Sequence, residues 1–152
     1  MQILRQWGCV VALMAVIFIA SSDLGSEAHT ARVIDPILAK LFRSLTPQHV
    51  EVIHGGLRKM AHLVEYALLG FFVARALGAF SIRSGVNWRM ALIGIAAASA
   101  FAVTDEFHQS FVPSRGACVH DVLLDSAGAI AGLTATVVAA RVGAGWSVRG
   151  MI

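Results

Sequence analysis

Four long apolar stretches, separated by short charged segments, dominate this sequence. They cover approximately residues 3–21, 59–80, 88–105 and 117–140. A helix needs about 20 mostly apolar residues to cross a bilayer, so each stretch suits one transmembrane helix. The composition agrees, because 57% of the 152 residues are hydrophobic and only 14% are charged, whereas a soluble domain carries about 25% charged residues. The sequence therefore predicts an all-α integral membrane bundle of four transmembrane helices, forming a single domain over residues 1–152.

The first stretch and the loop after it carry further signals. Arg5, a short apolar run and the small residues 20–22 also fit the outline of a cleaved signal peptide, so the fate of the first helix stays open. Within the loop, apolar residues recur at helical spacing over residues 33–42, with charged residues between them. This pattern predicts an interfacial amphipathic helix. The glycine pair at 55–56 is expected to break the helical pattern before the second span.

The distribution of charge predicts the orientation of the bundle. Basic residues without acidic neighbours mark the amino-terminal end, the loop between the second and third stretches, and the tail: Arg5, Arg75, Arg83, Arg89, Arg141 and Arg149. All nine acidic residues lie in the other two loops or in the spans beside them. Short cytoplasmic loops are enriched in Lys and Arg, so both termini are predicted to be cytoplasmic. Cys9 and Cys118 would then lie toward opposite faces, which disfavours a disulfide between them.

Ionisable residues interrupt three of the apolar stretches near their outer ends. Such residues cost roughly 2.5–3.5 kcal/mol each at the centre of a bilayer, so they are expected to face one another or water. In the second stretch, Lys59, His62 and Tyr66 recur at helical spacing and share one face, with Glu65 at its edge.

A second polar group closes the third stretch. If the helix continues past Asp105, then Asp105, His108 and Gln109 share a face and Glu106 lies beside them. A proline is expected to end this helix, which would leave Arg115 free to reach back toward carboxylates or an anionic ligand.

A third polar group opens the fourth stretch. Asp121, Asp125, Gly128 and Gly132 recur at helical spacing and form one stripe. Glycines let another helix pack directly against the backbone, so the helix that covers Gly128 and Gly132 should approach both aspartates as well. The glycine stripe is also the predicted contact of a homo-oligomer.

Together these groups predict one outward-facing polar pocket. The candidates for acid–base or ligand roles are His62, Glu65, Asp105, Glu106, His108, Asp121 and Asp125. The candidates for substrate binding are Lys59, Tyr66, Gln109 and Arg115. Among the latter, Lys59 and Arg115 would hold an anion such as a phosphate. A divalent metal held by His62, His108 and several of the carboxylates is a less favoured alternative, because the spacing matches no strong metal motif.

Several function classes are disfavoured or left open. The chain has no GxSxG motif, no phosphate loop and no basic run suited to nucleic acid, so the sequence does not decide whether it is an enzyme. His29, His49 and His54 are expected to be ordinary loop residues. The alternative to a ligand-binding or catalytic pocket is a structural or accessory protein, in which the ion pairs serve only to stabilise the bundle. A small proton-coupled transporter is disfavoured, because the inner halves of the spans carry few polar residues apart from Arg75.

The polar motifs also resemble a known family. The segments RKMAHLVEY at 58–66, DEFHQSFVPSR at 105–115 and DVLLDSAG at 121–128, together with the pair Ser21-Ser22, are similar in order and spacing to the VanZ-like family. One departure is Ser114, where the family usually has glycine. The resemblance implies a multi-pass protein of the bacterial cytoplasmic membrane. It also implies a lipid-linked envelope precursor, a cell-wall component or a glycopeptide as partner, since the family's namesake is linked to teicoplanin resistance. It implies no settled reaction.

Overall fold

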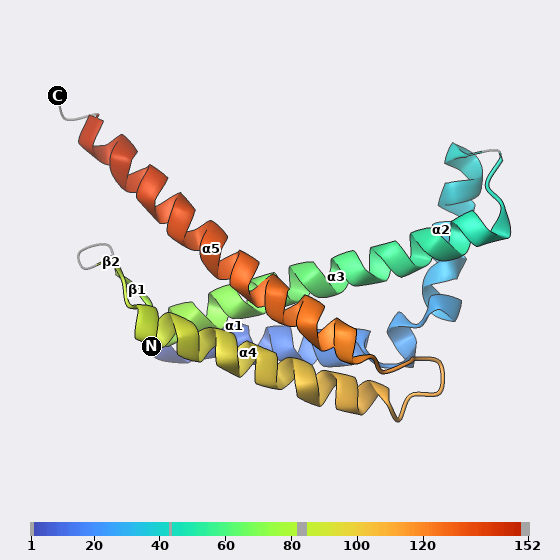
Figure 1. Cartoon of the computed structure of the whole chain (residues 1–152), viewed down its shortest axis with the longest axis horizontal. Coiled ribbons are helices and arrows are strands. Elements are labelled where there is room, and N and C mark those ends of the chain that lie inside the picture. Colours follow the sequence, from blue (N-terminus) through green and yellow to red (C-terminus); the bar gives the residue numbers. More distant parts are fainter. Residues whose placement is uncertain (1, 43, 82–84, 150–152) are drawn as a thin grey trace.

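The chain folds into five α-helices joined by short connections (Figure 1). The computed structural model describes residues 2–42, 44–81 and 85–149. The elements in chain order are α1 (Gln2–Ala20), the 3-10 turn η1 (Asp23–Gly25), α2 (Glu27–Leu41), α3 (Pro47–Ala76), β1 (Phe80–Ser81), β2 (Gly85–Val86), α4 (Trp88–Gln109) and α5 (Val119–Arg149). The two strands form a small antiparallel hairpin. The all-α prediction is confirmed. Arg83 and the side chains of Arg141 and Arg149 lie outside the described residues.

Helix α3 is longer than the sequence pattern predicted. It begins at Pro47, where the Thr46 hydroxyl accepts a hydrogen bond from the His49 amide, and it continues without a break through residues 55–56. The expected break at the glycine pair was therefore wrong. Glycine costs a helix only about 1 kcal/mol relative to alanine. The N-cap and the proline in the first turn stabilise the part of the helix that precedes the glycine pair. The helix ends before Gly78, which has a positive φ of 72°.

The centre of the bundle is formed by α3, which contacts α1, α2, α4 and α5. In Figure 1, α5 crosses α3, while α1 and α4 run beside it. The core mixes large and small buried side chains from four helices: Val10, Ile17, Tyr66, Leu69, Val73, Ala98, Ala102 and Ala129. The alanines come from α4 and α5, and small residues of this kind allow helices to approach closely.

The glycine stripe of α5 packs against α3, as the sequence predicted. A Cβ at Gly128 would lie 2.6 Å from the backbone oxygen of Leu63, and a Cβ at Gly132 would overlap the backbone oxygen of Ala67. The absence of side chains at Gly128 and Gly132 therefore permits backbone-to-backbone contact. This surface is occupied within one chain, so self-association through it would require α3 to leave.

The structure supports fewer membrane spans by length and composition than the predicted four. Two helices are long and apolar enough to cross a bilayer, Trp88–Gln109 and Val119–Val138. A third candidate combines Leu4–Ala20 with Asp23–Leu41, but these two helices are bent by 69° at the break between them. The predicted span at 59–80 is not among the candidates. That stretch includes the ionisable residues Lys59, His62, Glu65 and Arg75.

The outer surface of the bundle is nevertheless apolar, both on the two helices that qualify as membrane spans and on helices that do not. Val11 on α1, Leu92 on α4 and Leu123 on α5 are all more than 60% exposed. On α3, Val64 and Leu68 are exposed as well. A contiguous apolar exterior is unfavourable in water, whereas a bilayer has no such penalty. The chain is therefore a membrane protein.

Close packing of α5 on α3 can be tested by adding a single methyl group. We expect Gly128→Ala to lower the free energy of unfolding by about 1–3 kcal/mol, because the nearest atom is a backbone oxygen that cannot move aside. The measurement is thermal or denaturant unfolding in detergent, followed by circular dichroism. Gly8→Ala on α1 is the control, since a Cβ at Gly8 would meet nothing within 4 Å. Equal stability of the two variants would contradict the predicted contact.

Candidate functional site

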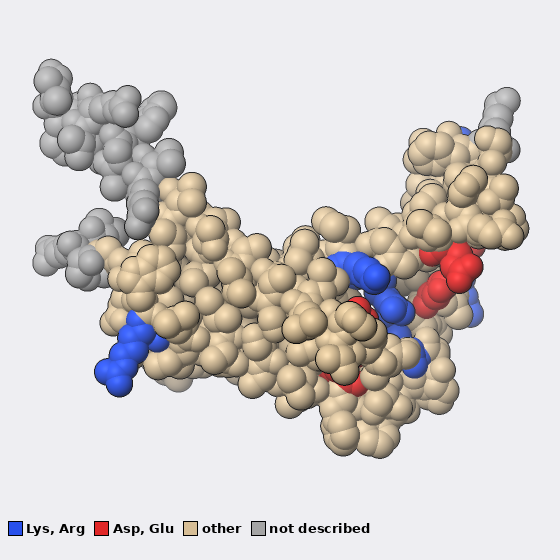
Figure 2. Space-filling view, in the orientation of Figure 1, with Lys and Arg blue, Asp and Glu red and all other residues tan. Residues whose placement is uncertain are grey.

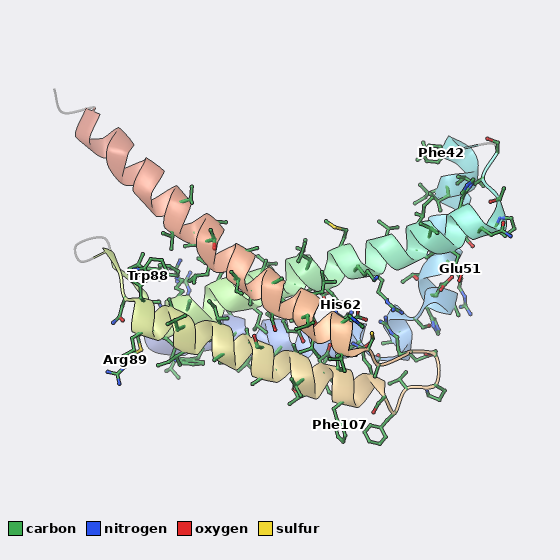
Figure 3. The ribbon with its side chains drawn as sticks, in the orientation of Figure 1. Phe42, Glu51, His62, Trp88, Arg89 and Phe107 are labelled. Atoms are coloured by element: carbon green, nitrogen blue, oxygen red, sulfur yellow. The ribbon has the colours of Figure 1, made fainter. Side chains whose placement is uncertain are left out.

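The ionisable groups predicted from the three motifs meet at one end of the bundle. They come from the middle of α3, the end of α4 and the start of α5, and they are joined by the end of α1. Figure 3 shows His62 near the start of α5, while Trp88 and Arg89 lie at the opposite end. The predicted continuation of the third helix past Asp105 is confirmed, since α4 extends to Gln109.

A buried pair joins α3 to α5. The Nδ1 atom of His62 lies 3.2 Å from one carboxylate oxygen of Asp125 and 3.4 Å from the other. Asp125 is fully buried and His62 is 6% exposed. One helical turn toward the end of the bundle, a guanidinium nitrogen of Arg58 lies 4.0 Å from Asp121. The close approach predicted for the helix that covers the glycine stripe is thus confirmed at both aspartates.

A second buried network joins α4 to the end of α1. The Ser21 hydroxyl donates a 2.7 Å hydrogen bond to Asp105 Oδ2, and the Gln109 side-chain amide donates to the same oxygen at 3.2 Å and to Ser21 Oγ at 3.3 Å. All three residues are buried. Sequence reasoning used Ser21 only for the family resemblance and missed its place in the site. A serine directly after an apolar span was the available signal.

Several buried oxygens at this end have no hydrogen-bond partner among the described residues. They are Tyr66 Oη, Asp105 Oδ1, Glu106 Oε1 and Asp125 Oδ1. The other oxygen of Glu106 accepts a 2.8 Å hydrogen bond from the Cys118 amide, which fixes the carboxylate. Burying an unpaired polar atom costs about 1–3 kcal/mol, and more for a charged group. Such atoms therefore mark positions where a proton, an ion or a ligand would stabilise the structure.

Among the described residues Arg115 does not reach a carboxylate, which was one of its two predicted partners; the other, an anionic ligand, stays a prediction. Its Nε donates to the Ser22 carbonyl oxygen at 3.4 Å, and its Nη2 donates to the Ala20 carbonyl oxygen. These carbonyls end α1, where the helix dipole favours a cation. Gly25 leaves room for the guanidinium, because a Cβ there would lie 2.5 Å from Nη2. The remaining nitrogen, Nη1, is buried and has no partner among the described residues.

The charge of Arg115 persists in this setting. Burial lowers the pKa of its guanidinium, and the positive charge of Arg58 lowers that pKa further. The carboxylates of Asp105, Glu65 and Asp23 act in the opposite direction. Arginine stays protonated in proteins because its ordinary pKa is so high. The site therefore holds a permanent cation with one free nitrogen.

A cavity of about 470 Å³ opens beside these groups, between η1, α2 and the first half of α3. Its lining is mainly apolar but includes the following charged or titratable residues: Glu27, His54, Arg58, His62, Glu65 and Arg115. Figure 2 shows basic side chains along a hollow between the body of the bundle and the lobe that contains α2, with acidic side chains next to them.

Of the eleven predicted site residues, His62, Glu65 and Arg115 line this cavity. The other eight are not in its lining: Lys59, Tyr66, Asp105, Glu106, His108, Gln109, Asp121 and Asp125. Lys59 is exposed and does not line it, whereas its neighbour Arg58 does. The imidazole of His108 stacks on Phe18 of α1, with ring centroids 3.9 Å apart. The predicted single pocket therefore does not form around all eleven residues, since four of the predicted carboxylates are buried outside the cavity lining: Asp105, Glu106, Asp121 and Asp125. A change of one residue turns a helical side chain by about 100°, so spacing alone did not resolve Lys59 from Arg58.

One histidine expected to be an ordinary loop residue has a structural role. His54 lies in α3, where its side chain is 4% exposed and its Nε2 lies 2.7 Å from the Asp35 carboxylate on α2. This contact joins α2 to α3 over the cavity. The expectation for His54 was wrong because the helix begins earlier than predicted, so that residue 54 already faces a packed partner.

The same end of the bundle offers ligand atoms for a metal. His62, Glu106 and Asp125 each present one nitrogen or oxygen, and these three atoms lie within 4.8 Å of one another. His62 and two of the carboxylates in the predicted metal set are thus close together, whereas His108 stacks on Phe18 and is not part of the group.

Comparison with known proteins identifies the family. No curated protein and no solved structure matches the chain. A family model described as VanZ/LLP1 matches residues 7–140, a range that includes all of the polar end described above. This match confirms the resemblance carried by the three polar motifs, and the chain belongs to the VanZ/LLP1 family.

Proposed function

We propose that this protein crosses the bacterial cytoplasmic membrane four times and binds an anionic, lipid-linked or cell-wall component at its outward-facing polar end. In this topology α1 and the second half of α3 are the two spans that add to α4 and α5, and α2 lies in the interface. The apolar residues Val33, Ile37 and Leu41 of α2 are exposed on one face of that helix, which suits contact with lipid.

The arrangement of the ends supports the proposed orientation. The start of α1, the β1–β2 hairpin and the last described turns of α5 lie at one end of the molecule, whereas the end of α4 and the start of α5 lie at the other (Figure 1). The end of α4 and the start of α5 carry the buried carboxylates Asp105, Glu106, Asp121 and Asp125. Arg89 belongs to the first of these ends. Basic residues mark cytoplasmic loops, so the polar end would face outward.

The observation that carries this proposal is a pair of guanidiniums beside one cavity. Arg115 and Arg58 both line the cavity, and both guanidiniums can donate to the oxygens of a phosphate or carboxylate. The Arg58–Asp121 distance of 4.0 Å leaves Arg58 only weakly engaged. A ligand with an acidic head group would therefore gain two cationic donors without breaking a strong internal pair.

The rest of the lining favours an amphiphilic ligand over a small ion. Ala20, Ile34, Leu57 and Ala61 present apolar surface, and pockets that bind organic ligands combine such surface with a few polar groups. His62 and Glu65, in the middle of α3, are titratable groups that line the cavity, as does His54 nearer the start of the helix. His54 is already engaged by Asp35. If the ligand is chemically modified, the side chains of His62 and Glu65 are positioned to move a proton.

Binding of a long-chain polyprenyl phosphate to the purified protein in nanodiscs tests this function. We expect Arg58→Gln to weaken binding by roughly 10- to 100-fold, because a hydrogen bond to a charged group contributes about 1.5–3 kcal/mol. Arg89→Gln is the matched control at the opposite end and should bind like the wild type. The uncharged polyprenol should bind far more weakly. Equal binding of phosphate and alcohol, or of Arg58→Gln and the wild type, would refute the proposed site.

A charge exchange separates ligand binding from a purely structural role of the ion pairs. We expect Arg58→Asp alone to lower membrane abundance, and Arg58→Asp combined with Asp121→Arg to restore abundance. Polyprenyl phosphate binding should remain at least tenfold weaker in the double variant, since the cation then lies on α5 and outside the cavity lining. The measurements are abundance by immunoblot of membranes and binding as above. Restoration of both properties would favour a structural role alone.

A further inference from the structure

The buried ligand atoms of His62, Glu106 and Asp125 carry a separate inference. We propose that these three residues bind one divalent transition-metal ion, of the kind represented by Zn²⁺ or Mn²⁺. They come from α3, α4 and α5, which are the three helices that supply the predicted polar motifs. The metal site itself does not depend on the anion-binding function proposed above.

The geometry places three donors around one point. Their ligand atoms lie within 4.8 Å of one another, and His62 Nδ1 lies 3.2 Å from Asp125 Oδ1. Two ligands bound to one Zn²⁺ at about 2.0–2.2 Å in tetrahedral geometry are about 3.4 Å apart. The pair of His62 and Asp125 already has about this separation, and Glu106, whose ligand atom lies within 4.8 Å of both, would move closer to complete the set.

The charge of the group also favours a divalent cation. Two carboxylates and one neutral imidazole carry a net charge of −2, and all three residues are more than 90% buried. Buried carboxylates are stable only when they are protonated, paired or bound to a metal. Glu106 Oε1 has no hydrogen-bond partner among the described residues. One divalent ion would neutralise the group and occupy that free oxygen.

The surroundings hold the donors in place and leave an open side. The Cys118 amide fixes Glu106 through its other oxygen, as outer hydrogen bonds commonly do for metal ligands. The nitrogen and oxygen donor set suits Zn²⁺ or Mn²⁺. Because His62 also lines the cavity, an ion there would add positive charge close to Arg58 and Arg115. That additional role, unlike the site itself, rests on the proposed function.

Metal content of the full chain tests the site without any ligand. The protein, purified in detergent without an affinity tag, is treated with chelator and then equilibrated with Zn²⁺ or Mn²⁺. We expect one ion per chain by mass spectrometry of the metal, and visible d–d bands when Co²⁺ replaces it. Asp125→Asn and Glu106→Gln should each weaken binding by at least about 100-fold, since losing a direct ligand should cost no less than losing an outer partner.

A second His–Asp pair of the same chain provides the matched control. Asp35→Asn changes a carboxylate that lies 2.7 Å from His54 but is not part of the three-residue group. This variant should keep one ion and the Co²⁺ bands. If Asp125→Asn fails to fold, the metal content of Glu106→Gln alone tests the site. Failure of the folded wild type to retain an ion, or equal retention by Glu106→Gln, would overturn the proposal. Either outcome leaves polyprenyl phosphate binding to be judged by its own test.

Discussion

The contact between the backbones of α3 and α5 is the constraint on which the polar end of this protein depends. Gly128 and Gly132 let the two helices approach until a methyl group would not fit between them. That approach brings His62 to within 3.2 Å of Asp125. The chemistry of the site thus follows from two residues that have no side chain, because helices held at the usual distance of about 8–10 Å would separate the imidazole from the carboxylate.

The same end concentrates nearly all of the polar groups that the bundle buries. Asp105 and Gln109 engage Ser21, Glu106 engages the Cys118 amide, and Arg115 engages carbonyls at the end of α1. Each bond joins different segments of the chain, so the network fixes how the helix ends meet. Within the described part of the chain, it leaves buried atoms without a hydrogen-bond partner on six residues: Tyr66, Asp105, Glu106, His108, Arg115 and Asp125. A network that served stability alone would be expected to satisfy its members, and these atoms are the reason to assign ligands to this end.

Much of the fold and part of the site follow from sequence. The apolar stretches predicted helices, and the regular spacing of Asp121, Asp125 and the glycines predicted which surface meets another helix. Sequence could not give where α3 begins or which of its faces meets the cavity, because both depend on the cap at its start and on contacts with α2. The sequence pattern therefore assigned Lys59 to the pocket, whereas Arg58 lines the cavity. The partners of Arg115 are backbone carbonyls, and a sequence pattern of side chains carries no information about them.

The bonding of Arg115 limits how the site can change during evolution. One guanidinium holds the carbonyls at the end of α1 through two nitrogens, lines the cavity, and has a third, buried nitrogen with no partner among the described residues. Lysine has a single nitrogen and lacks this planar fork, so it could serve the helix end or the cavity but not both in the same geometry. A change in ligand preference is therefore expected to come from substitutions at other residues that line the cavity, such as Ile34, Leu57 and Arg58.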